Sequence, residues 1–163
     1  MRTIPENRLH KKMTTVWRVS GFIWAFIVAL LCFATAIPVW IATYQSLLGF
    51  WFLILAAVIT VLCFLLLCII LPPIRYMRWR YAVREDEIEI YRGIIVHKHI
   101  VVPLVRVQFI DTAQGPIMRP FGLASINIST AAGEQSIPGL LLPDADALRN
   151  RVADLAKLVH EDV

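Results

Sequence analysis

The chain has 163 residues, 58% of them hydrophobic, and a formal net charge of +4. Soluble domains are about 45–50% apolar, so this composition excludes an ordinary, wholly soluble protein. Residues 1–84 hold nine of the Lys and Arg residues and one acid, whereas residues 85–163 hold seven against eleven acids. The C-terminal part therefore lacks the basic balance of a nucleic-acid-binding domain. The basic residues nearer the N-terminus fit contacts with anionic lipid headgroups instead.

Residues 1–18 are polar and basic, and we predict that they form a short cytoplasmic leader. Ala34-Thr35-Ala36 resembles the small-residue cleavage site of a secretory signal peptide. The apolar run continues past this point to a length that spans a bilayer, which favours a membrane helix over a cleaved signal.

Residues 19–74 contain no Lys, Arg, Asp, Glu or His. One membrane span needs about 20 apolar residues, so this run predicts two transmembrane helices, at about 19–43 and 47–71. Pro72-Pro73 is expected to end the second helix. Both flanks are basic and the connecting turn is uncharged, so the positive-inside rule predicts that both termini are cytoplasmic.

The membrane part offers little chemistry. Its three cysteines, Cys32, Cys63 and Cys68, are interpreted as buried thiols that fill space. Transporters usually keep an ionisable residue inside the bilayer, and here only weak substitutes such as Gln45 and Thr60 are present. A role as a channel or transporter subunit is therefore the least favoured hypothesis.

Residues 75–163 are predicted to form one small cytoplasmic domain of antiparallel strands closed by a C-terminal helix. Alternating hydrophobic residues indicate strands, separated by turn residues rich in Gly and Pro. Val105, Val107 and Phe109 are expected to share one face of a strand. The strands are expected at about 80–84, 87–91, 94–102, 105–111, 125–130 and 135–137. Asp144 is expected to cap the helix, whose apolar residues recur at spacings of four and three.

This order of elements is similar to that of a pleckstrin-homology (PH)-like domain, a bent antiparallel β-sandwich or barrel with a C-terminal capping helix. The segments 102–108, 114–124 and 137–140 resemble the bacterial PH family found beside membrane spans, the membrane-flanked, YdbS-like proteins. Gly115, Arg119 and Gly122 have the spacing of that family's central motif. The resemblance implies a bacterial protein of the cell (inner) membrane, from a family that is largely uncharacterised. It also implies that the protein acts together with larger relatives that carry several copies of the same domain.

Three further residues are candidate contacts for a partner or an anion. Arg119 lies in an otherwise apolar loop, where it either fixes the loop by bonding carbonyls or Asp111, or binds an anion or partner. His97 and His99 are two residues apart and would share a strand face, but two imidazoles lack the third ligand that a zinc site needs. We therefore predict no metal and no cofactor, and we interpret the histidine face as solvated or as an interface.

Four arginines follow the apolar run and are candidates for a lipid-interface collar: Arg75, Arg78, Arg80 and Arg84. They either attract anionic lipid or only set the topology. Specific phosphoinositide recognition is not expected, because the turn between the first two predicted strands of the domain is Glu85-Asp86, which repels phosphate.

No nucleophile, P-loop, dinucleotide or zinc-protease motif is present, so the sequence predicts a protein that is not an enzyme. The favoured hypothesis is a membrane-anchored scaffold or adaptor subunit of a bacterial membrane assembly. Its expected partners are lipid and protein, the latter a larger relative with several copies of the domain or another copy of this chain, with no nucleic acid. The alternative is an anionic-lipid-sensing membrane module.

Overall fold

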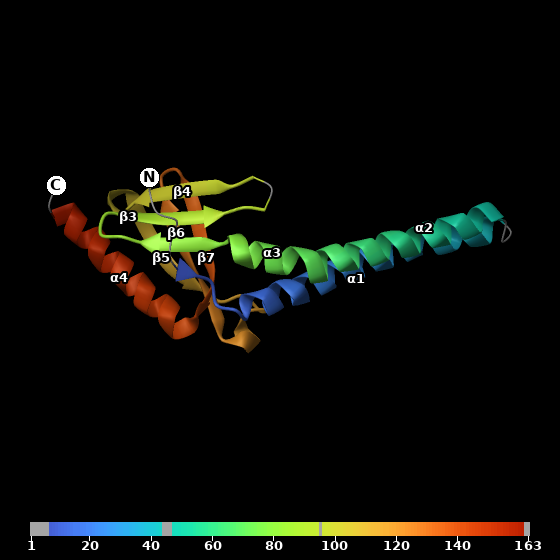
Figure 1. Cartoon of the computed structure of the whole chain (residues 1–163), viewed down its shortest axis with the longest axis horizontal. Helices are drawn as coiled ribbons and strands as arrows, with labels where there is room; N and C mark the ends of the chain where they lie inside the picture. Colours follow the sequence, from blue (N-terminus) through green and yellow to red (C-terminus); the bar gives the residue numbers. More distant parts are fainter. Residues whose placement is uncertain (1–6, 44–46, 95, 162–163) are drawn as a thin grey trace. The chain divides into compact units, whose positions relative to one another are not determined.

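A computed structural model describes residues 7–43, 47–94 and 96–161, with side chains as far as Leu155. The chain divides into two compact units (Figure 1). One unit contains residues 17–73, and the other joins the N-terminal residues up to Val16 with residues 74–163. The two units are described separately below.

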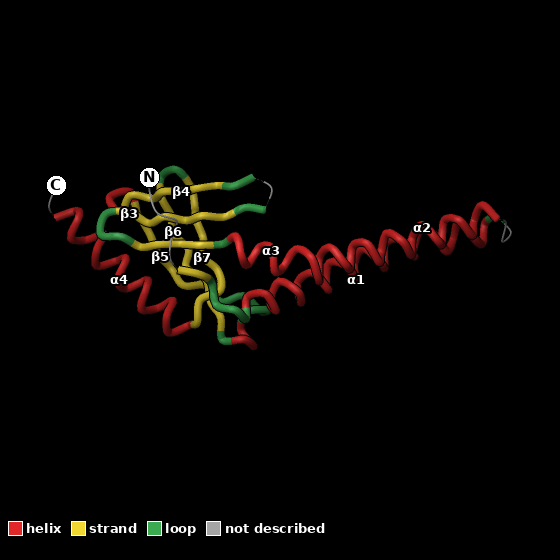
Figure 2. The backbone as a smooth tube through the Cα atoms, in the orientation of Figure 1, coloured by secondary structure: helices red, strands yellow, loops and turns green. Residues whose placement is uncertain are grey.

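The first unit is a hairpin of apolar helices. α1 (Met13–Ala42) lies beside α2 (Leu47–Phe64), which continues through a π-helical turn, η1 (Leu65–Ile70), into α3 (Leu71–Arg78) (Figure 2). Both helical stretches are long and apolar enough to cross a membrane. The expected connecting turn, including Gln45, lies outside the described residues.

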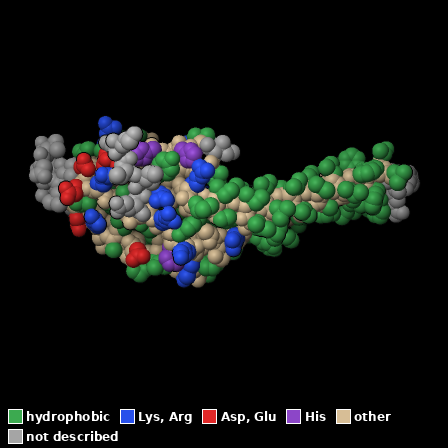
Figure 3. All heavy atoms as spheres, in the orientation of Figure 1, with side chains coloured by type: hydrophobic (Ala, Val, Ile, Leu, Met, Phe, Trp, Pro, Cys, Tyr) green, Lys and Arg blue, Asp and Glu red, His purple; other side chains and the backbone are tan. Residues whose placement is uncertain are grey.

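Small residues let the two helices approach closely. Gly21 of α1 faces the backbone of Leu67, and a side chain at position 21 would collide with that carbonyl. The rings of Phe22 and Phe64 meet edge to face, with centroids 6.4 Å apart. Close backbone contact of this kind is typical of helix pairs in membranes, where packing rather than the hydrophobic effect holds helices together. The outward side chains are almost all hydrophobic (Figure 3).

The helix does not end at Pro72-Pro73 as expected. Proline lacks the N–H that an α-helix requires, and its ring presses on the carbonyl one turn earlier. Here the wider π-helical turn at Leu65–Ile70 comes directly before the prolines. Such turns are known sites of helix adjustment. The helical path consequently continues to Arg78, one residue before Trp79.

The second unit contains two antiparallel sheets (Figures 1 and 2). The four-stranded sheet has the order β1-β2-β3-β4, and the three-stranded sheet has the order β5-β6-β7. Their bounds are β1 (Asn7–Arg8), β2 (Arg80–Val83), β3 (Glu87–Arg92), β4 (Lys98–Pro103), β5 (Val107–Ala113), β6 (Leu123–Thr130) and β7 (Gly133–Leu141). The predicted antiparallel sheet architecture with a C-terminal helix is confirmed.

The core of this unit is made by alternating residues of both sheets. Ile88 and Ile90 of β3 and Ile126 and Ile128 of β6 are at most 1% exposed. Burying each such side chain contributes about 1.5–3 kcal/mol relative to leaving it in water. Strand β5 departs from the expected pattern. The strand begins only at Val107, after a 3-10 turn. A bulge between Val107 and Phe109 shifts the pairing register with β6, and the side chain of Phe109 is 63% exposed.

Residues 7–16 of the expected leader belong to this unit. Asn7 and Arg8 pair with Tyr81 and Arg80 of β2, which makes β1 the edge of the four-stranded sheet. Leu9, Met13 and Val16 are 2%, 2% and 4% exposed. The spacing of these three residues, four and then three, is that of one helix face, and this was the sequence signal that could have revealed the packing.

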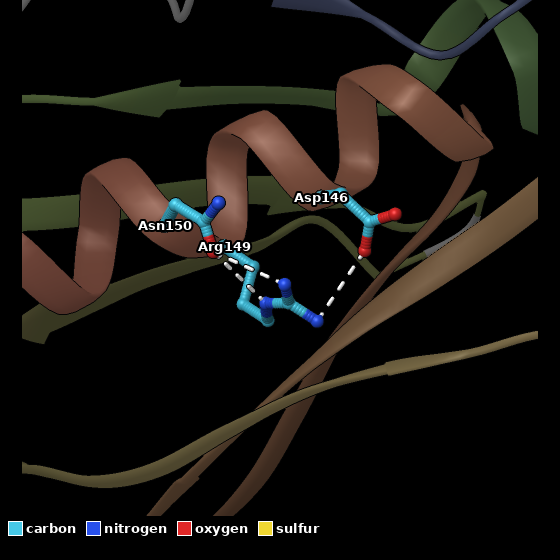
Figure 4. Close-up of polar contacts among 3 residues, drawn as sticks. All are labelled: Asp146, Arg149 and Asn150. Carbon is cyan, nitrogen blue, oxygen red and sulfur yellow. Dashed lines mark hydrogen bonds and ion pairs between the residues drawn. The ribbon is translucent and has the colours of Figure 1, made fainter.

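The C-terminal helix α4 (Leu142–Glu161) packs against β5, β6, β7 and the 3-10 turn η2 (Leu104–Arg106). Ala145 and Val152 are buried in this contact. On the outer side Arg149 lies 3.3 Å from Asp146 and donates hydrogen bonds to the Oδ1 atom of Asn150 (Figure 4). The helix starts at Leu142, so Asp144 lies in its first turn rather than at the expected cap.

Candidate functional site

The four arginines of the expected collar have different neighbours within the protein. Arg75 lines a pocket with Arg92 and Lys98. Arg78 contacts the Nε2 atom of His97, and Arg84 pairs with Glu89. Arg80 stands in β2 opposite Arg8 and Tyr91. The four arginines thus make different contacts within the protein, and their expected role at the lipid interface stays a prediction.

Glu89 is fully buried, and nothing in the sequence pattern distinguishes it from an ordinary exposed strand residue. Its Oε1 atom lies 3.3 Å from Nε of Arg84, and its Oε2 atom lies 3.7 Å from Nε2 of His99. Neither oxygen accepts a hydrogen bond from a residue that the structure describes. A buried carboxylate needs compensation, and the partly exposed guanidinium of Arg84 supplies a positive charge beside it. A lone Glu in an alternating strand normally faces water, which is why sequence reasoning missed it.

Both histidines contact the ring of Tyr91. The ring of His97 stacks on Tyr91 with centroids 5.9 Å apart, and His99 tilts against the same ring at 6.1 Å. Both histidines are solvent-exposed. Within residues 7–43, 47–94 and 96–161, no group of three His, Cys, Asp or Glu side chains could hold a metal ion. The pair is therefore arranged as an aromatic and polar surface around Tyr91.

The loop that contains Arg119 is held by other residues. The Gln114 side chain donates a hydrogen bond to the carbonyl of Leu123, and Gly122 adopts a positive φ of 67° that ends the 3-10 turn η3 (Arg119–Phe121). Asp111 accepts a long hydrogen bond, 3.5 Å, from Asn127 rather than one from Arg119. The Arg119 side chain is exposed and has no hydrogen bond or ion pair to the described part of the chain. Its expected loop-fixing role is not seen.

A basic pocket of about 310 Å³ lies at the end of the β3–β4 hairpin. Its charged residues are Arg75 of α3, Arg92 at the end of β3 and Lys98 at the start of β4, and its apolar residues are Trp79, Ile94 and Val96. Neither Asp nor Glu is among the described residues that line it. Figure 3 shows basic side chains on one face of this unit.

Comparison with known proteins assigns the chain to a family. The sequence pattern of the bacterial PH domain matches residues 16–156. The chain belongs to the bacterial PH domain family. Consistent with this, it is 36% identical to the UPF0699 transmembrane protein YdbS of Bacillus subtilis over 163 residues, all of both proteins. The expected family resemblance and the expected membrane character are thereby confirmed.

A second family relative is much larger. The UPF0699 transmembrane protein YdbT of Bacillus subtilis is 29% identical over 68 residues, which are 42% of this chain but 14% of that protein. No solved structure matches the chain. Within the bacterial PH domain family, the structure thus adds a description of how the domain and its apolar hairpin are built.

Proposed function

We propose that this protein is a non-enzymatic, membrane-anchored adaptor that binds another protein of the bacterial PH domain family. The observation that carries the proposal is an exposed, largely apolar surface where the 3-10 turn η2 meets β5, an outer strand of the three-stranded sheet. We call it the β5 surface and define it by Val105, Val107, Gln108 and Phe109. Val105 is 43% and Phe109 is 63% exposed. Aromatic side chains that stand exposed among polar neighbours are frequent anchors of protein interfaces.

The shape of the β5 surface supports the same role. A groove of about 560 Å³ runs beside it, lined by residues 105–108 and 130–132. The strand lies at the edge of its sheet, with backbone groups that have no neighbouring strand among the described ones. Sheet edges and grooves beside them are common sites of partner addition.

The occupant that we propose is a second PH-like domain, either in a larger relative or in another copy of this chain. The larger relative YdbT supports the first possibility, because the matched 68 residues occupy 14% of its length and leave room for further domains. The hairpin would hold both proteins in the same membrane, which raises their effective concentration.

For the membrane part, we propose two crossings of the bacterial cell membrane with both termini in the cytoplasm. The basic flanks and the uncharged connection support this orientation. The pairing of β1 with β2 adds a second argument. Residues on either side of the hairpin share one sheet, which supports an arrangement with both ends of the hairpin on the same side of the membrane.

The test places a photo-crosslinking amino acid at position 109 of the tagged full-length protein in its membrane. The matched control carries it at position 151, an exposed site on α4. We expect a stoichiometric crosslink from position 109 to a bacterial PH domain protein, and none from position 151. Phe109→Ser should weaken capture of the same protein from mild detergent. A monomer that retains only lipid, or equal crosslinking from both positions, would refute the adaptor.

A further inference from the structure

The two helices of the helical hairpin enclose an apolar hollow of about 230 Å³. It is lined by four residues between positions 32 and 39 of α1 and by four between positions 52 and 59 of α2. In each helix the four residues follow the spacing of a single face, so two facing stripes form the walls. Ala36 and Ala56 are the most buried of them, at 6% and 5% exposed. We call this space the hairpin hollow.

Glycine contacts hold the helices together on either side of the hairpin hollow. On one side Gly21 faces the backbone of Leu67. On the other side, a Cβ atom at position 49 would come within 2.9 Å of the Cα atom of Trp40. The helices are already in backbone contact at both points, so they cannot close over the hollow by moving together. The hollow is therefore a fixed feature of the helix pair, open to whatever surrounds the hairpin.

The lining of the hairpin hollow suits a hydrocarbon rather than a polar ligand. The Thr35 hydroxyl donates hydrogen bonds to the carbonyls of Leu31 and Cys32, at 3.2 and 2.9 Å, so it is satisfied within its own helix. The thiol of Cys32 is only a weak hydrogen-bond donor. Residues 19–74 include no charged side chain and no histidine. An apolar cavity of this kind excludes water and binds apolar molecules.

The size of the hairpin hollow favours a single chain over a helix. A helix with its side chains is about 10–12 Å wide and rises 5.4 Å per turn, so one turn fills at least about 400 Å³. That is more than the 230 Å³ of the hollow. Phe52 and Leu55 line the hollow and are more than half exposed, so these bulky side chains keep another helix backbone at a distance.

We propose that the hairpin hollow binds an acyl chain of a membrane lipid. Ala36 lies six residues before Ala42, the last residue of α1, about 9 Å along the helix axis. Ala56 lies nine residues after Leu47, the first residue of α2, about 14 Å along the axis. Half of the hydrocarbon core of a bilayer is about 15 Å thick, so both residues lie at the depth of acyl chains in the leaflet nearer the helix connection. The site rests on the two proposed membrane crossings but not on the adaptor role.

The test uses phosphatidylglycerol that carries a photoreactive diazirine in the middle of one acyl chain. The full-length protein is placed in nanodiscs that contain this lipid and is irradiated, and peptide mass spectrometry locates the lipid adducts. Ala56→Phe fills the hairpin hollow, and Ala57→Phe is the matched control, the same change at the next residue, which is exposed. Ile59→Trp fills the hollow from a wall residue that is 38% exposed, which leaves the glycine contacts in place.

We expect adducts of the wild type and of Ala57→Phe to gather on residues 32–39 and 52–59. In Ala56→Phe and Ile59→Trp, adducts at these positions should fall to the level of an outward residue such as Leu30. An unchanged melting temperature of Ile59→Trp in detergent then assigns the loss to the filled hollow rather than to separated helices.

Three other results would overturn the acyl-chain site. The first is an even spread of adducts over all exposed residues of α1 and α2, and the second is an undiminished cluster at the hollow in both filling variants. The third is a disulfide between the Cys32 residues of two copies, which would show that a second copy covers the hollow. The absence of adducts from both helices would instead refute the membrane crossings on which the site depends.

Discussion

The side chain of Met13 lies directly against Gly139, so a Cβ atom at position 139 would come within 2.7 Å of the Met13 Cγ atom. The backbone nitrogen of His10 also donates a hydrogen bond to the Gly139 carbonyl, at 2.8 Å. Met13 and Gly139 stand at opposite ends of the sequence. Their contact shows that the N-terminal segment is a packed part of the PH-like unit.

Gly139→Ala is expected to destabilise this unit for two reasons. The φ of 72° at position 139 disfavours any residue with a Cβ atom, at roughly 1–2 kcal/mol, and the new methyl group collides with Met13. In a double-mutant cycle, Met13→Ala should relieve the collision but not the backbone strain. Thermal unfolding of the four proteins in one detergent measures the coupling. Strictly additive effects would show that the two residues do not touch.

The buried carboxylate of Glu89 makes its cationic neighbour important. Arg84→Ala removes the group 3.3 Å from Oε1 and leaves the charge of Glu89 less compensated in the interior. Because Arg84 is partly exposed and His99 remains, we expect a loss of up to about 3 kcal/mol. The double substitution Arg84→Met with Glu89→Met should recover most of it, since an apolar pair needs no compensation. Chemical denaturation measures the free energy of unfolding of both variants. A double variant no more stable than Arg84→Ala would show that Arg84 does not compensate the buried Glu89.

The raised pKa of Tyr81 predicts how the free energy of unfolding changes at alkaline pH. Burial raises the pKa of its phenol above the ordinary value of 10.0, and the Asp144 carboxylate raises it further. Above about pH 10 the unfolded chain releases this proton while the folded chain retains it. The free energy of unfolding must therefore fall as pH rises through that range, and the contribution is fully present below it. Tyr81→Phe should reduce this fall in thermal unfolding measured from pH 9 upward, and an unchanged slope would refute the assignment.

The close approach of the hairpin helices at Gly21 can be tested by enlarging the side chain at position 21. Gly21→Val places a branched side chain against the Leu67 carbonyl and should push α1 away from the π-helical turn η1. The control Leu30→Val changes a side chain that is 58% exposed on the outside of the hairpin. We expect the melting temperature in detergent to fall for Gly21→Val and to change little for the control. Equal melting temperatures would mean that the helices do not depend on this contact.

The sequence predicted the features that depend on local pattern. The uncharged run of residues 19–74 predicted two apolar helices, and alternating hydrophobic residues predicted a strand at about 125–130, which the structure shows as β6. Features that depend on tertiary packing were missed. The π-helical turn that carries the helix past Pro72 and the bulge that exposes Phe109 are geometric adjustments without a composition signal.

In the candidate sites, too, the sequence indicated what depends on local pattern and missed what depends on tertiary packing. Sequence reasoning identified Arg75 as a basic residue beside the apolar run, but it did not connect Arg75 with Arg92 and Lys98. Arg92 and Lys98 are separated from it by more than a dozen residues and meet it only when β3 and β4 fold back. Likewise, the burial of Glu89 depends on Arg84 and His99 standing beside it, on either side of its strand.

The placement of β1 fixes an order of events during synthesis. Residues 7–16 leave the ribosome first, yet the groups that they pack against, in β2 and at Gly139, are made only after the whole apolar hairpin. Until then Leu9, Met13 and Val16 have no core to enter. The whole hairpin is therefore synthesised before the globular unit can close, and the packing of residues 7–16 is necessarily a late step in the folding of this unit.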